Sequence, residues 1–124
     1  MKTLVLLLAG LACAASAATA DAASYPVSGR WGQSANSDKG PIDCRGKRVI
    51  TFNGNQRTDS NGGVPAYRNR SVTADGPAQY RVVDEFSNAQ VSNAHTSYTL
   101  RQVDADRIEI RLQQGGTLKL QRCK

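Results

Sequence analysis

The chain has 124 residues, a formal net charge of +6 and 40% apolar residues, with three cysteines and one histidine. This length fits one small domain rather than two. Beyond the N-terminus, no stretch approaches the roughly 18 apolar residues of a transmembrane helix, so we expect no membrane-spanning segment.

The first twenty residues have the composition of an export signal. Lys2 precedes the apolar stretch 4–11, and small residues follow as far as Ala20. This order is typical of a secretory signal peptide. We therefore predict that residues 1–20 are a signal peptide and that residues 21–124 are one domain, exported to the bacterial periplasm or the medium.

Two alternatives concern the same region. The triplet 15–17 offers a second cleavage site. A lipoprotein acylated at Cys13 is the other alternative, although Gly10 stands where that signal needs an aliphatic residue. Cleavage after residue 20 leaves a domain with 15 Lys and Arg against 10 Asp and Glu, 11 of those cations being arginine.

Cleavage also leaves two cysteines, Cys44 and Cys123, which are 79 positions apart. An even pair in an oxidising compartment predicts a disulfide, with two free buried thiols as the alternative. Two distant cysteines and the single His95 cannot complete a tetrahedral metal site. We expect neither a metal nor another cofactor.

The exported chain has the patterning of β-strands. After an extended segment at 21–28, we expect strands at 29–32, 48–52, 66–72, 79–86, 97–101, 107–113 and 117–123, because β-branched, aromatic or alternating apolar residues stand between turn residues. The last three form an antiparallel meander. In 79–86 the alternation places Asp84 on the inner face, so we expect either a bulge or a position near the rim.

Polar, turn-rich stretches at 34–41 and 58–63 are expected to be loops. No window shows the apolar stripe of an amphipathic helix. We predict an all-β fold, a small antiparallel up-and-down β-barrel of about seven or eight short strands, with a β-sandwich as the alternative.

Gly29-Arg30-Trp31, at the start of a small secreted all-β chain, resembles the G-x-W signature of calycin-type barrels. The resemblance implies that Trp31 plugs one end of the barrel and that an arginine of a late strand, here Arg122, lies over it. In size the chain is most similar to bacterial barrels that inhibit metalloproteases. In that family the segment before G-x-W enters the protease cleft, which here implies Ser24, Tyr25, Pro26 and Val27.

Catalytic patterns are scarce. His95 is the only candidate base, and both cysteines of the exported chain are expected in the disulfide. Asp84 and Glu85 are adjacent on a strand, so they point to opposite faces and form no carboxylate pair. We expect a protein that is not an enzyme.

Charge is the remaining indication of function. Arg45, Lys47 and Arg48 follow Cys44 directly and form a candidate patch for an anionic partner, the alternative being ordinary solvated surface. Aromatic residues do not alternate with these cations, so we expect no nucleic acid partner.

Two hypotheses for the function follow from these observations. The first is a monomeric, non-catalytic barrel that binds a protein through its surface, including a protease as its inhibitor. The second is a cationic accessory protein that binds an anionic envelope polymer or lipopolysaccharide.

Overall fold

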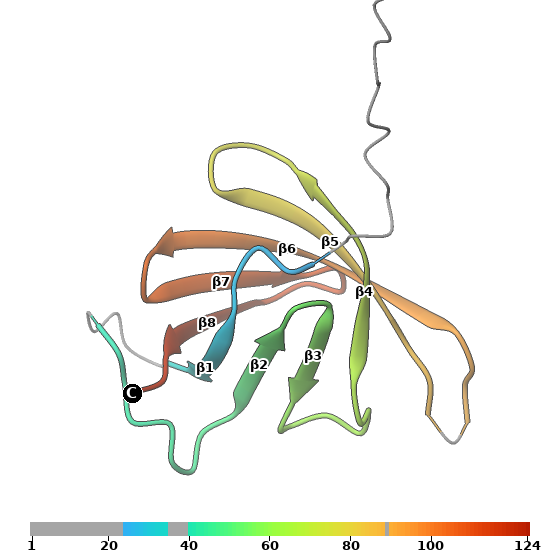
Figure 1. Cartoon of the computed structure of the whole chain (residues 1–124), viewed down its shortest axis with the longest axis horizontal. Helices are drawn as coiled ribbons and strands as arrows, with labels where there is room; N and C mark the ends of the chain where they lie inside the picture. The colour runs from blue at the N-terminus through green and yellow to red at the C-terminus, as the bar shows by residue number, and fades with distance from the viewer. Residues whose placement is uncertain (1–23, 35–39, 89) are drawn as a thin grey trace, which may run out of the picture.

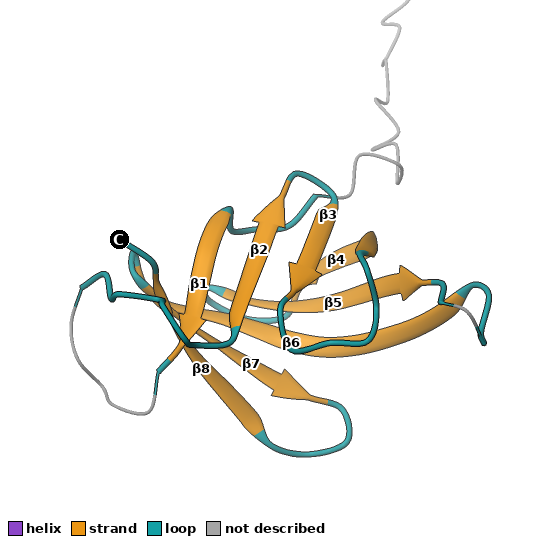
Figure 2. Ribbon diagram, turned by 90° about the horizontal axis from the view of Figure 1, so that it is seen from below, coloured by secondary structure: helices purple, strands orange, loops and turns teal. Residues whose placement is uncertain are grey.

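The computed structural model describes residues 24–34, 40–88 and 90–124, and eight antiparallel strands close into a barrel (Figure 1, Figure 2). Each strand pairs with the next along the chain, and the last pairs with the first. The predicted up-and-down barrel is therefore confirmed over the sandwich. The strands are β1 (Gly29–Gln33), β2 (Val49–Asn53), β3 (Gln56–Asp59), β4 (Tyr67–Ala74), β5 (Gln79–Phe86), β6 (Ala94–Asp104), β7 (Arg107–Leu112) and β8 (Thr117–Arg122).

The signal peptide predicted at 1–20 lies outside the described residues. Within the described ranges, the chain forms no helix long and apolar enough to cross a membrane.

Seven strands match the expected positions within a few residues, and β6 is longer than expected. β3 was missed, because 58–63 was predicted to be a loop and no strand was expected at 56–57. Its four residues are all polar, and its inward side chain is Arg57, which is 7% exposed. Strands are recognised in a sequence by alternating apolar residues. Because the buried position of β3 holds an arginine, this signal is missing.

Inward side chains from both halves of the chain fill the barrel. Trp31, Val82 and Leu100 have no exposed surface. Two residues of the segment before β1, Tyr25 and Val27, join this core at 7% exposure each. The remaining members are Ile50, Phe52, Tyr98, Ile108, Ile110 and Leu120. A barrel of eight strands has an interior that is about wide enough for side chains alone to fill.

Asp84 occupies the inner face of β5, as the alternation predicts, and is fully buried, which agrees with the expected bulge rather than with a position near the rim. β5 stays in register with β6 from Gln79 to Phe86. The irregularity lies in the neighbouring strand instead, between Asn69 and Ser71 of β4. A bulge there turns Asn69 toward Asp84, and its Nδ2 donates a hydrogen bond to Asp84 Oδ1 at 3.2 Å.

The predicted disulfide between Cys44 and Cys123 is confirmed, and it joins the loop before β2 to the residue that follows β8. Ile42 forms a parallel bridge with Cys123, and its N–H donates to Arg122 O at 2.8 Å. The loop therefore extends the sheet beside β8. Gly32 of β1 lies under the disulfide, where a Cβ would collide with Cys44 Sγ.

Candidate functional site

One end of the barrel contains the Trp31–Arg122 pair expected from the G-x-W resemblance. Gly29 enters β1 with a positive φ of 92°, a conformation that favours glycine. Two positions later the Trp31 indole turns into the barrel, and its Nε1 donates to Ser28 O at 3.0 Å. The guanidinium carbon of Arg122 lies 4.4 Å from the centre of the Trp31 ring. This distance is within the range of a cation–π contact.

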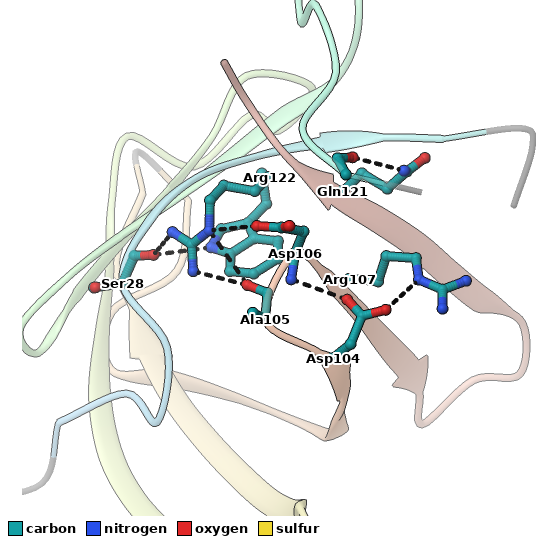
Figure 3. Close-up of polar contacts among 9 residues, drawn as sticks. Ser28, Asp104, Ala105, Asp106, Arg107, Gln121 and Arg122 are labelled. Carbon is teal, nitrogen blue, oxygen red and sulfur yellow. Dashed lines mark hydrogen bonds and ion pairs between the residues drawn. The ribbon is translucent and has the colours of Figure 1, made fainter. Parts of the chain in front are cut away.

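Arg122 also ties the turn between β6 and β7 to the start of β1 (Figure 3). Its Nη2 and Nε donate to Ala105 O at 3.1 and 3.3 Å, and its Nη1 donates to Ser28 O at 3.3 Å. Asp106 Oδ1 lies 3.5 Å from its Nε. One side chain thus covers the indole and connects three segments at this end of the barrel.

The candidate inhibitory segment is partly committed to the core. The Tyr25 N–H donates to Gly54 O at 2.9 Å, and the Tyr25 ring packs edge-on against Phe52 with centroids 4.9 Å apart. Val27 is also buried, Pro26 is half-buried and Ser24 is exposed. The side chains of Tyr25 and Val27 are therefore not presented to a protease cleft in this conformation.

A charged cluster lies inside the barrel, and it surrounds Asp84, the carboxylate that the alternation of 79–86 places on the inner face. Arg57 Nε donates to Asp84 Oδ2 at 2.8 Å, and the Tyr98 hydroxyl donates to the same oxygen at 3.0 Å. The Arg57 guanidinium also stacks over the Tyr67 ring at 3.8 Å. Asp84 therefore accepts three hydrogen bonds, counting that from Asn69, and its charge is balanced by Arg57.

Burial changes how the tyrosines of this cluster titrate. Burial raises the pKa of Tyr98 well above its usual value, with the positive charge of Arg57 opposing the shift and the carboxylate of Asp84 adding to it. Burial, followed by the carboxylate of Asp84, also raises the pKa of Tyr25. Both hydroxyls stay protonated at neutral pH, so the cluster acts as a structural unit.

Cations gather on the outside of the barrel around the disulfide. We define the disulfide face as Arg30, Arg45, Lys47 and Lys124. With Asp43, three of them line a hollow of about 390 Å³ beside Cys44 and Cys123. The guanidinium of Arg45 pairs with Asp43 at 2.7 Å and, with smaller contributions from Lys124 and Lys47, lowers the pKa of that carboxyl. Four cations thus surround one carboxylate.

The third residue of the predicted patch, Arg48, is not a free cation. Its Nη2 and Nε bind the two carboxylate oxygens of Asp59 at 2.6 and 3.0 Å. Burial opposes ionisation of Asp59, but Arg48 and the Asn61 N–H outweigh it and lower the pKa of Asp59. Of the predicted patch, Arg45 and Lys47 therefore remain on the disulfide face, where the disulfide brings Lys124 beside them and β1 contributes Arg30.

His95, the only histidine, lies on the exposed side of β6, where its Nε2 is 3.9 Å from Glu85 Oε2. Glu85 also accepts a hydrogen bond from Arg70 at 3.3 Å. Across the described ranges, the structure holds no group of three or more His, Cys, Asp or Glu side chains that could bind a metal ion.

Comparison of the chain with protein families, curated proteins and solved structures finds no match.

Proposed function

We propose that this protein is an exported, non-catalytic β-barrel that binds an anionic partner of the cell envelope through the disulfide face. The observation that carries the proposal is the charge of this face, where Arg30, Lys47 and Lys124 are exposed and have no ion-pair partner among the described residues. The disulfide joins the segments that carry Lys47 and Lys124, and the Cys123 N–H donates to Arg30 O at 2.9 Å. Uncompensated cations on a fixed surface attract polyanions and accelerate their association.

Binding at the surface agrees better with this barrel than binding inside it. Trp31 and Leu100 fill the interior, and the Arg57–Asp84 pair occupies the space between β3 and β5. An apolar ligand in this interior would separate a buried ion pair, at a cost of several kcal/mol.

The test compares two double variants that remove the same charge from different faces. Arg30→Gln with Lys124→Gln should strongly weaken binding to lipopolysaccharide, whereas Arg68→Gln with Lys119→Gln should leave it nearly unchanged. Wild-type binding should also weaken steeply with added salt, because exposed charges are screened within about 8–10 Å at physiological ionic strength. Salt-insensitive binding, or equal loss in both variants, would contradict the proposal.

A second candidate function, protease inhibition, is supported by the Trp31–Arg122 contact and by the eight-strand barrel, both of which agree with kinship to calycin-type inhibitors. In this proposal the chain before Tyr25 enters the cleft of a secreted metalloprotease. Tyr25 and Val27 then act as the anchor, because both are buried in the core.

Deletion of residues 21–24 tests inhibition without removing a core side chain. The truncated protein should keep its thermal stability and lose inhibition. Equal inhibition by the two proteins, or none by either, rejects this candidate.

A further inference from the structure

A second cationic surface lies on the outer face of β5, β6 and β7, away from the disulfide. The strand register places Arg81 opposite Thr99, and Thr99 opposite Arg111. These three side chains therefore form one row across three strands. Directly opposed residues stand about 5 Å apart, so the two arginines leave β-carbons separated by about 10 Å with a threonine between them.

Neither arginine has an ion-pair or hydrogen-bond partner among the residues that the structure describes. Within the described part of the chain, no carboxylate or hydrogen-bond acceptor contacts the guanidinium of Arg81 or that of Arg111. The carboxylate nearest along β7, Glu109, pairs with Arg101 at 3.8 Å. Most other arginines of this barrel lie against a carboxylate. Arg81 and Arg111, on either side of Thr99, therefore form a local excess of positive charge.

The row borders a hollow of about 200 Å³. Besides the two arginines and Thr99, its walls include Ser97 and Gln113, which offer a hydroxyl and an amide. The hollows beside Asp43, Glu85 and Glu109 each contain a carboxylate, whereas this one contains none. Its polar groups are therefore guanidinium, hydroxyl and amide groups that can donate hydrogen bonds to an oxyanion.

We propose that this hollow, the Arg81–Arg111 site, binds a phosphate or sulfate ester group of an anionic glycan. Long side chains on either side of Thr99 can bring both guanidinium groups onto one tetrahedral group, with the threonine hydroxyl beneath it. Arginine binds such groups through paired N–H donors, and charge-assisted bonds of this kind are about twice as strong as neutral ones.

The surroundings favour a glycan over a membrane or a nucleic acid. Ser97, Thr99 and Gln113 supply the neutral hydrogen-bonding groups that sugar hydroxyls need. Tyr98, the only aromatic residue of the lining, is 5% exposed and offers no face for stacking a base. Leu112, the one large aliphatic residue of the lining, is half-buried and packs against the core, and the exposed Val91 and Val103 are not part of the lining. The hollow therefore offers no exposed apolar side chain to insert into a bilayer.

This site is separate from the disulfide face, so either one can fail without the other. The test is a nuclear magnetic resonance titration of the isotope-labelled protein with glucose 6-phosphate, with glucose as the control ligand. Glucose 6-phosphate should shift the amide signals of Ser97, Thr99 and Arg111, and glucose at the same concentration should not.

Three double variants locate the binding. Arg81→Gln with Arg111→Gln should weaken binding by at least about tenfold, because it removes hydrogen bonds to a charged group. The two double variants designed above, at Arg30 and Lys124 and at Arg68 and Lys119, should bind as the wild type does. All of these side chains are exposed, and thermal melting confirms that each variant folds.

Four results would overturn the proposal. They are the absence of saturable binding, an unchanged affinity after loss of Arg81 and Arg111, signal changes at Arg30 and Lys124 in place of Thr99, and equal binding of phosphatidylglycerol vesicles or single-stranded DNA through the same arginines. The last result would assign the site to a membrane or a nucleic acid instead of a glycan.

Discussion

Two arginines of this barrel lie over aromatic rings in very different surroundings. Arg122 covers Trp31 at the barrel end, and its side chain keeps 37% of its surface exposed. Arg57 stacks on Tyr67 inside the barrel, and its side chain keeps 8%. The first is hydrogen-bonded mainly to backbone carbonyls, whereas the second is balanced by the fully buried carboxylate of Asp84.

Burial determines whether an arginine side chain needs a counter-charge. Water still solvates much of Arg122, so carbonyl oxygens and an indole face suffice. Arg57 has lost that solvation, and a buried cation without a partner is strongly destabilising. We therefore expect the two regions to respond very differently to loss of a single partner.

The largest effect is expected for Asp84→Ala. This substitution leaves Arg57 buried without its counter-charge and should lower the free energy of unfolding by about 3–5 kcal/mol. Urea unfolding measures the change. The control is Arg57→Met combined with Asp84→Leu, which removes both charges and should recover most of the loss. If Asp84→Ala were as stable as the wild type, the ion pair would have no structural role.

The next largest effect is expected at the Arg122 end of the barrel, when both Cys44 and Cys123 are replaced by serine. The disulfide closes a loop with a sequence separation of 79, and its loss should lower the free energy of unfolding by about 2–5 kcal/mol. The bond adjoins Arg122, so hydrogen exchange of the β1–β8 amides should accelerate more than exchange near Asp84. Uniform acceleration would show that the disulfide does not act on that end in particular.

Alkaline pH should act on the buried cluster and not on Trp31. Because burial raises the pKa of Tyr98 above the usual value of 10.0, its contribution to stability is complete below pH 10 and is lost as the pH rises above it. Each pH unit above 10 should cost about 1.4 kcal/mol for this tyrosine. Urea unfolding as a function of pH measures the slope.

The matched variant for this measurement is Tyr98→Phe. It removes the ionisable hydroxyl and its hydrogen bond to Asp84, so it should be less stable at neutral pH and less sensitive to alkaline pH. An unchanged slope in this variant would assign the alkaline transition to other groups.

The smallest effect is expected for Arg122→Met, which keeps an apolar cover over Trp31 and removes the charge. It should lower the free energy of unfolding by about 1 kcal/mol and change the tryptophan fluorescence. Arg122→Lys should recover part of the loss, because it restores a cation without the paired donors. A loss as large as that of Asp84→Ala would contradict the contrast between the two regions.

The sequence indicated much of the barrel end around Trp31 and Arg122, and little of the buried cluster around Arg57 and Asp84. The glycine and tryptophan of G-x-W, the arginine near the C-terminus and the cysteine pair are local or compositional signals. The inner cluster lacks such signals, because Arg57 and Asp84 are 27 positions apart. Each one taken alone breaks the apolar alternation of its strand. For this reason β3 was missed, and either a bulge or a position near the rim was expected at Asp84.

The candidate surfaces show the same limit. Arg45 and Lys47 were expected to act together because they are close in sequence, and Arg48 was included for the same reason. Instead, Asp59 binds Arg48, while the disulfide brings Lys124 and the closure of the barrel brings Arg30 to the disulfide face. The Arg81–Arg111 site was not anticipated, because its residues come from three strands.

From the sequence alone one can predict that residues 21–124 are rich in strands, how most of those strands alternate and which two cysteines pair. These properties depend on side-chain periodicity and on the number of cysteines, which are readable without knowing the neighbours in space. Tertiary structure alone decided that the sheet closes, that an ion pair is buried in it and which arginines stay without partners. Those outcomes depend on strand register, because the register decides which distant side chains become neighbours.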